Sequence, residues 1–386
     1  MNRKALLLLF VVLALSVSSV FATDSRMTAL GNPFGFIRDN SDISAYPGVI
    51  NMYERNLRGE LGMSSSDWKI GANLPFMGNT LGVYLNTDTN IDVDDFFTTW
   101  NHYSTGDLDI SKKIQFYYGF MEKFGVGFAM AMDSKKKDLT GVADKFANLS
   151  ATYFELTGGM SDEKMDIGAG IGFWGASSKN DIDANEATLG GFGFSAQGRY
   201  FVMENDDFDF VASANLAINS NSQEDKTAAS NSTVDVSMML FDLGVGMNYK
   251  FDAKNSIIVT MKPLSFKSEG WEQKDPSATD KGSESWMYIP TYSIGLESQI
   301  KPWLTGRVGA SQHYAFYSDK YDPAGTTNSE DSEYLSGFNM DMGLAFKFNK
   351  FTVDTVLSKT LLHDGPDFIG GRSPGLASMV SVDYNF

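Results

Sequence analysis

Apolar and polar residues alternate along most of this chain. In the stretch Phe338–Phe348, the apolar residues Phe338, Met340 and Met342 occupy every second position, and Asn339 and Asp341 lie between them. Successive side chains of a β-strand point to opposite faces, so a period of two places one face against an apolar medium and the other against water. The pattern therefore predicts strands that separate hydrocarbon from a wet compartment.

The same alternation recurs along the chain and predicts a β-rich fold. We expect strands at Leu57–Met63, Trp68–Leu74, Leu81–Leu85, Leu108–Phe120, Phe124–Met132, Leu149–Met160, Met165–Trp174, Phe192–Met203, Phe208–Ile218, Val236–Phe251, Ile257–Phe266, Trp286–Ile300, Trp303–Phe316, Phe338–Phe348, Phe351–Leu357 and Leu376–Phe386. Membrane proteins place aromatic side chains at the bilayer boundary. We expect this position for five aromatic residues near strand ends: Trp68, Trp174, Trp286, Tyr288 and Trp303.

The connections between these strands are short and long in turn. Short turns such as Lys301-Pro302 and Asn349-Lys350 alternate with polar stretches that we expect to be loops: Ser134–Asn148, Ser177–Thr188, Asn219–Thr233, Lys267–Ser285, Ser318–Glu333 and Thr360–Gly375. This arrangement is typical of antiparallel membrane barrels. It predicts an all-β transmembrane antiparallel β-barrel of about 14–16 strands over residues 57–386. A soluble β-sandwich would have fewer strands and would not keep the alternation of connections.

The two ends of the chain indicate export to a membrane. Residues 1–22 combine the basic Arg3 and Lys4, an apolar core and the small-residue site Val20-Phe21-Ala22, which predicts a secretory signal peptide. The last strand ends on the aromatic Phe386 and resembles the closing strand of bacterial outer-membrane barrels. That resemblance implies the bacterial outer membrane as location, its lipids as surroundings, and the barrel assembly machinery as a partner that reads the terminal aromatic.

Composition excludes several classes of protein. The chain contains no cysteine, which excludes disulfides and thiolate metal sites. Its formal net charge of −17 argues against nucleic acid as a partner, because binding to nucleic acid requires a basic surface. Much of the acidity falls in the expected external loops, where divalent cations could bridge it to anionic lipid headgroups.

Residues 23–56 precede the alternating pattern and have a different character. Asp39 or Ser41 could cap a short helix, and Pro47 suits the first turn of a second one. Gly31 permits a tight bend. The apolar residues of this segment favour burial: Phe34, Phe36, Ile37, Ile43, Val49, Ile50 and Met52. We therefore expect a plug with short helices inside the barrel, in which the notable residues are Arg26, Gly31, Asp39, Asp42 and Pro47.

This opening segment resembles the start of FadL-type outer-membrane channels for long-chain fatty acids and aromatic hydrocarbons, and of related type IX secretion barrels. The resemblance rests on Arg26–Gly31, on Asp39–Asp42 and on Tyr46-Pro47-Gly48, followed by a strand near Leu57. Asn32 stands where that family has a second glycine. The resemblance implies a plug folded inside a barrel and a passive channel for hydrophobic or amphipathic solutes.

Charged and polar residues at inward positions are the candidate lumen residues. Turning such a charge toward lipid costs about 2–4 kcal/mol near the bilayer midplane, so these side chains are expected inside. They are Lys113, Arg199, Asp209, Asp242, Glu297, Arg307, His313, Asp341 and Asp354. They could brace the barrel wall or line a solute path, and both interpretations stay open.

Candidate chemistry is sparse. The three histidines, His102, His313 and His363, are far apart, and we find no nucleophile motif, so we expect no enzyme. The acidic stretch Asp88–Asp95 lacks the glycine and glutamate of an EF-hand loop, and a solvated loop is the preferred interpretation over loose cation binding. The glycine alternation Gly168–Gly172 suggests a strand with a bare inner face that leaves room for a plug or a solute. We expect no metal and no cofactor.

The pattern as a whole predicts a passive channel or transporter. The alternative is an outer-membrane barrel without transport activity that docks secreted or surface proteins. An open general porin is disfavoured by the apolar residues of the expected plug.

Overall fold

The structure is a computed structural model that describes residues 24–62, 68–91, 93, 110, 112–138, 146–180, 186–204, 207–226, 231–275, 278–325, 327–357 and 377–386. The predicted signal peptide at 1–22 lies outside the described residues. The described helices are α2 (Asp24–Ala29), η1 (Asn40–Ile43) and η2 (Pro47–Met52). None of these helices has the length and apolar character needed to cross a membrane.

Sixteen β-strands in the described part of the chain form one antiparallel sheet that closes into a barrel. They are β1 (Asn56–Leu61), β2 (Trp68–Phe76), β3 (Asn79–Leu85), β4 (Ile114–Phe120), β5 (Phe124–Asp138), β6 (Phe146–Ser161), β7 (Met165–Asn180), β8 (Glu186–Glu204), β9 (Phe208–Lys226), β10 (Asn231–Lys250), β11 (Asn255–Asp275), β12 (Ala278–Lys301), β13 (Leu304–Asp322), β14 (Ser329–Phe348), β15 (Phe351–Leu357) and β16 (Ala377–Asn385). Each strand pairs with its neighbour in sequence, and β1 pairs with β16, where Leu57 lies opposite Tyr384. The predicted closed antiparallel barrel is confirmed.

The two faces of the sheet carry the side chains that the alternation predicts. In β5, Gly125 and Gly127 are buried whereas Val126 between them is 47% exposed. In β14, Asp341 is buried and Met340 is 47% exposed. Because the sheet is closed, one face encloses the interior and the other forms the outer surface. The outward apolar residues are therefore exposed, and the inward small and charged residues are covered.

The predicted long loops are wrong over most of their length. The stretch Lys267–Ser285 belongs almost entirely to β11 and β12, and Ser318–Glu333 belongs largely to β13 and β14. Both faces of these strand ends carry polar residues, so the period-two contrast disappears from the sequence. The backbone pairing nevertheless continues, as where Gly270 lies opposite Ser283.

The other long stretches show the same error in part. Most of Asn219–Thr233 and Ser177–Thr188 is strand, and Ser134–Asn148 is strand at its two ends. The predicted loop Thr360–Gly375 lies outside the described residues. The strand expected from Leu108 begins at Ile114, and Leu108 is also outside them.

The aromatic prediction is partly wrong. Trp174 is 5% exposed, and its indole nitrogen donates to the inward Asn221 at 3.2 Å. Trp286 lies in the interior, with the amine of Lys267 5.0 Å from its ring centroid. Tyr288 packs against the ring of His313. Trp303, in contrast, is 49% exposed and stacks on Phe346 at the outer surface. A large ring near a strand end can lie at the bilayer boundary only when it is also on the outward face.

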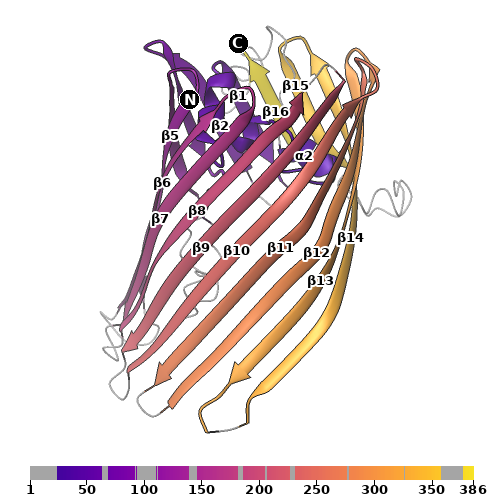
Figure 1. Cartoon of the computed structure of the whole chain (residues 1–386). Helices are drawn as coiled ribbons and strands as arrows, with labels where there is room; N and C mark the ends of the chain where they lie inside the picture. Colours follow the sequence, from indigo (N-terminus) through magenta and orange to yellow (C-terminus); the bar gives the residue numbers. More distant parts are fainter. Residues whose placement is uncertain are drawn as a thin grey trace, which may run out of the picture.

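The two ends of the barrel differ: the N-terminal helices lie near one end, and the long strands β9–β14 extend to the other. Figure 1 shows α2, β1 and β16 at the end where the C-terminus lies, while β9–β14 run toward the opposite end. Near the first end, α2 contacts β13–β16 and η2 contacts β3–β7. The residues before β1 therefore lie between opposite walls, beside the short turns such as Met121–Lys123.

Candidate functional site

The N-terminal segment, residues 24–55, owes its shape to local capping. Asp39 accepts a hydrogen bond from the backbone nitrogen of Ser41 at 2.8 Å, and Asp42 accepts one from the backbone nitrogen of Asp39 at 2.9 Å. This reciprocal capping box begins η1. Pro47 lies at the start of η2, where its missing N–H removes no helical bond. The predicted helix cap at Asp39 and the predicted helical start at Pro47 are confirmed.

Gly31 joins α2 to the rest of the N-terminal segment. Its φ is +80°, a left-handed conformation that glycine adopts without strain. A Cβ at this position would also lie 3.0 Å from the backbone of Ala310 on β13. Conformation and close approach to the wall thus both require glycine here.

One ion network ties α2 to the barrel wall. Arg26 makes a bidentate contact with Glu297 of β12, with Nε–Oε2 and Nη2–Oε1 distances of 2.9 and 3.1 Å. Arg307 of β13 contacts the same carboxylate, with an Nε–Oε2 distance of 2.5 Å, and also pairs with Asp354 of β15. Charge-assisted bidentate pairs of this kind fix orientation as well as adding attraction. Four predicted residues are therefore brought together.

A second network ties η1 to the opposite wall. The side chains of Arg199, Asp42 and Asp166 are fully buried. Arg199 lies 2.8 Å from Asp42 and 2.6 Å from Asp166, and it donates to the carbonyl of Ile37 at 2.7 Å. Arg38 of the N-terminal segment also pairs with Asp166, at 3.1 Å. One guanidinium of the wall thus holds two separate points of the N-terminal segment.

The Asp42 carboxylate is poorly solvated in this position. Burial raises the pKa of Asp42 to about 7, with Arg199 opposing this shift and the neighbouring charge of Asp39 adding to it. Removal of a carboxylate from water disfavours its charged form, and a nearby cation offsets only part of that cost.

A third contact fixes the N-terminal segment at the seam where the barrel closes. The amide nitrogen of Asn40 donates to Asp383 of β16 at 2.9 Å, and that of Asn56 in β1 donates to the same carboxylate at 2.8 Å. All three residues are buried. Asp383 therefore joins the N-terminal segment, the first strand and the last strand.

Glycines on the inner wall make the room that the N-terminal segment occupies. A Cβ on Gly168 of β7 would overlap the carbonyl oxygen of Ala45, and one on Gly125 of β5 would overlap the carbonyl of Pro47. The bare inner face predicted from the glycine alternation of β7 is confirmed. Packing of the backbone of the N-terminal segment directly against the wall requires these positions to lack side chains.

Two cavities lined by described residues lie in the interior, on the side of the N-terminal segment that faces the far ends of β9–β11. The first, about 320 Å³, has Phe34, Ala45 and Tyr46 of the N-terminal segment as part of its lining. The second, about 710 Å³, lies along β9, β10 and β11. Asn90 and Asn215 line both cavities, so the two are adjacent. Phe34 is 47% exposed, whereas neighbouring apolar residues of the segment such as Phe36 and Ile43 are buried.

The remaining predicted lumen residues lie outside the two ion networks. They are Lys113, Asp209, Asp242, His313 and Asp341. Asp242 pairs with Lys262 at 3.2 Å, and Asp209 lies 4.0 Å from Lys250. Lys113 is buried 5.3 Å from the ring centroid of Tyr153. Asp341 accepts from Asn339, and His313 packs edge-on against Tyr288 at 5.6 Å.

Sequence reasoning missed Arg38, Asp166 and Asp383. Asp166 stands two residues before Gly168, so the same alternation that exposes the glycines places its carboxylate on the inner face. Asp383 alternates with the apolar Val382 and Tyr384 of the last strand, so the sequence indicates its face but not its partner. The period of two identifies the face of such residues; it does not identify which residue of a distant segment meets them.

The acidic stretch after β3 is described only in part. Asp88 lies 2.6 Å from Lys69 of β2, while Asp92, Asp94 and Asp95 are outside the described residues. Within the described ranges, no group of three or more carboxylates or histidines is placed to hold a metal ion.

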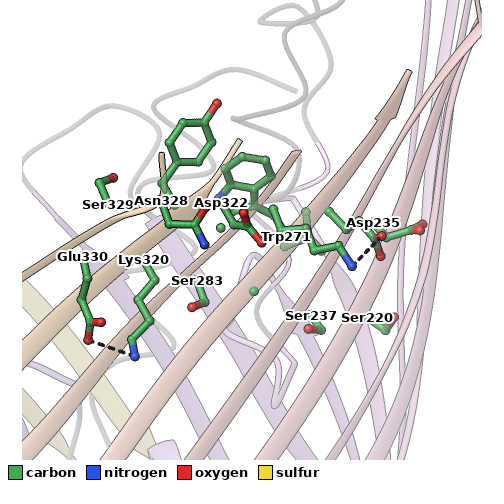
Figure 2. Close-up of a pocket in the computed structure, with 16 residues that line it drawn as sticks. Ser220, Asp235, Ser237, Trp271, Ser283, Lys320, Asp322, Asn328, Ser329 and Glu330 are labelled. Carbon is green, nitrogen blue, oxygen red and sulfur yellow. Dashed lines mark ion pairs between the residues drawn. The ribbon is translucent and has the colours of Figure 1, made fainter. Parts of the chain in front are cut away.

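A groove of about 730 Å³ lies on the far part of β9–β14. Most of its lining residues, such as Ser220, Ser237 and Ser283, occupy outward positions of their strands. The inward Trp271 and Tyr321 also border it. Figure 2 shows these serines to one side of the Lys320–Glu330 ion pair, whose N–O distance is 2.9 Å. The outer surface is therefore polar at this end of the barrel.

Comparison with known proteins returns only distant likenesses. No family model matches the sequence, and no curated protein matches it. Among solved structures, a mutant of the monoaromatic hydrocarbon channel TodX is 12% identical, with 95% of this chain and 100% of that chain covered and a TM-score of 0.40. The monoaromatic hydrocarbon channel CymD is 10% identical (96% and 98% covered, TM-score 0.39). The toluene transporter TbuX of Ralstonia pickettii is 12% identical (94% and 97% covered, TM-score 0.36). At these scores, neither fold details nor function are carried over from the three proteins.

Proposed function

We propose that this chain is an integral barrel of the bacterial outer membrane that lets small amphipathic molecules pass, with the N-terminal segment as its plug. The proposed passage is passive and involves no covalent chemistry. The proposal is supported by the outer surface, by the docked N-terminal segment and by the interior cavities.

The outer surface favours contact with lipid. Large apolar side chains face outward in register on neighbouring strands, as at Phe173 and Phe192, which are 50% and 51% exposed. Ile171 and Phe194 form the next outward pair and are each 41% exposed. Contiguous exposed apolar surface is unfavourable in water and is expected against hydrocarbon. Where the outer face turns to serine at the far end of β9–β14, we place the boundary of the bilayer with its lipid headgroups.

The observation that carries the proposal is that the interior cavities end on the N-terminal segment. The 320 Å³ cavity is lined by Phe34 and Tyr46 of that segment and adjoins the larger cavity at Asn215. A solute that reaches this point from the far end meets the docked segment. Release on the other side requires the segment to move or the wall to open.

The lining of the larger cavity favours an amphipathic solute. Asn215 and Gln223 of β9 present amides, whereas Val236, Met238 and Leu240 of β10 present apolar side chains. One side of a bound molecule would meet hydrogen-bonding groups and the other side apolar surface. Ligand sites commonly combine apolar walls with a few polar groups in this way.

Gly168→Val tests the plug. The added side chain would occupy the place of the Ala45 carbonyl, so the N-terminal segment should leave the wall and the single-channel conductance in planar bilayers should rise several-fold. Gly190→Val on the adjacent β8 is the matched control, because a Cβ at Gly190 meets no atom within 4 Å. Both variants should keep the heat-modifiable migration of a folded barrel on gels. Equal conductance in a folded Gly168→Val variant and in wild type would sink the proposal.

The groove on the outer face favours a second candidate function, the docking of a secreted or surface protein. Its floor of small residues and its charged rim would suit an extended polar segment of a partner. If docking is the function, a protein partner should co-purify and Ser237→Trp should release it, with conductance unaffected by Gly168→Val.

We further propose that the barrel assembly machinery reads the C-terminal strand at Phe386.

A further inference from the structure

The inner face of β9 carries a row of amides. Asn215, Asn219, Asn221 and Gln223 point inward and line the 710 Å³ cavity. Trp174 donates its indole N–H to the Asn221 oxygen at 3.2 Å, which orients that amide. A carboxamide both donates and accepts hydrogen bonds. The row therefore matches ligand groups that do the same, and hydroxyl groups are the simplest of these.

Aromatic pairs lie on the same inner surface, across β11–β13. Trp271 of β11 lines the cavity and packs on Tyr321 of β13, with ring centroids 5.8 Å apart. On the same face of β12 and β13, Trp286 and Tyr317 form a second pair, with ring centroids 5.3 Å apart. Gly282 lies directly between Trp271 and Tyr321 in the register, so no side chain separates the two rings. The interior thus combines an aromatic surface with a row of amides.

This combination discriminates between classes of solute. A pure hydrocarbon would take water from the amides of β9 without replacing their hydrogen bonds, which is unfavourable. Lys267 and Glu269 both line the cavity, and further carboxylates adjoin Glu269, which lies opposite Glu284, itself opposite Asp319. This excess of inward carboxylates over the single charge of Lys267 disfavours anions. A neutral molecule with an apolar ring face and a rim of hydroxyls satisfies both the aromatic and the amide groups.

We propose that the cavity along β9–β11 is a binding site for neutral sugars, with pyranose rings stacked on Trp271 and their hydroxyls paired with the amides of β9. The inference deepens the proposed function by naming the class of solute, and it rests on that function for access to the interior. The site lies between the far end of the barrel and the N-terminal segment. A solute that enters from the far end therefore binds before any movement of the plug.

The test is direct binding to the full-length barrel in detergent, measured by calorimetry with maltohexaose as the probe. Wild type should bind, and Asn215→Leu and Trp271→Leu should each lower the affinity at least tenfold. Ser220→Leu, on the outward face of β9, is the matched control and should stay within twofold of wild type. All variants should keep heat-modifiable migration, which separates a lost site from a misfolded barrel.

Other outcomes would overturn the inference. They are no binding of maltohexaose by wild type, binding of toluene that survives Asn215→Leu, or tighter binding of tetramethylammonium than of maltohexaose. Because binding in detergent requires no transport, the result is separate from the conductance test. A rise in conductance in Gly168→Val without sugar binding would remove the inference and leave the plug proposal standing.

Discussion

The ion pairs at the two ends of the barrel contrast sharply. At the N-terminal segment, the side chains of Arg199, Asp42 and Asp166 have no exposed surface. On the far part of β13 and β14, Lys320 and Glu330 are 59% and 62% exposed. The two sets contain the same types of charge at similar distances. They differ in their access to water and in the cation, which is arginine in the buried network and lysine in the exposed pair.

The two sets of ion pairs therefore have different roles. The buried pairs fix the N-terminal segment to the wall, and the exposed pair only adds charge to a hydrated surface. Arginine presents a planar fork that can contact two carboxylates at once and is less strongly hydrated than lysine, so it suits buried pairs. A buried pair also leaves an uncompensated charge if one partner is lost. An exposed lysine pair is screened by water and salt and contributes little. The contrast therefore predicts that equal substitutions at the two ends have unequal effects.

Arg199→Met should have the largest effect. It removes the cation that lies between Asp42 and Asp166 and leaves both carboxylates buried, which costs about 3–5 kcal/mol. Hydrogen exchange at residues 24–53 should accelerate strongly, while exchange in β10–β13 should change little. A variant that keeps wild-type protection in residues 24–53 would show that Arg199 does not hold the N-terminal segment. Lys281→Met, which breaks the exposed contact with Glu272, is the matched control.

The pH dependence of Asp42 should have an intermediate effect. Because burial raises its pKa to about 7, the folded protein binds a proton at Asp42 that the unfolded chain, with an ordinary carboxyl pKa near 3.8, has already lost. The stability contributed by this proton is complete below the lower pKa and is lost as pH rises through the higher one. Between pH 5 and pH 7 the free energy of unfolding should fall by about 1 kcal/mol per pH unit.

The measurement is guanidinium unfolding in detergent at several pH values, with Asp42→Asn as the control. The amide keeps the shape of the side chain but does not titrate, so the difference between wild type and this variant isolates Asp42 from Asp39, Asp166 and Arg199. A difference that does not change between pH 5 and pH 7 would contradict the assigned pKa.

The sequence allowed the barrel to be predicted because its signal is local. In β5 and β14 the alternation places glycine or aspartate inward and valine or methionine outward, and each strand shows this without reference to the others. The ends of β10–β12 lack that signal, because Ser237 and Ser283 lie on the outer face while polar residues such as Glu269 lie on the inner face. Strand and loop cannot be told apart there by periodicity, since only the backbone pairing continues.

The site could be predicted only in part, for a related reason. The capping role of Asp39 and the helical start at Pro47 depend on neighbours within a few residues, and both were found. The contact of Asp42 with Arg199 joins residues far apart in the chain, and its geometry depends on the closure of the whole barrel. The inward face of Arg199 was predictable; its partner was not.

Lys320→Ala should have the smallest effect and so sharpens the contrast from the other end. The pair with Glu330 is more than half exposed on both sides, so its loss should change the free energy of unfolding by at most about 1 kcal/mol. Because water and salt already screen this pair, the small difference from wild type should shrink further when ionic strength is raised. The effect of Arg199→Met should hardly respond to salt, since its partners are buried. Guanidinium is itself a salt, so urea unfolding at low and high sodium chloride is the suitable measurement. If Lys320→Ala proved as costly as Arg199→Met, access to water would not be what distinguishes the two ends.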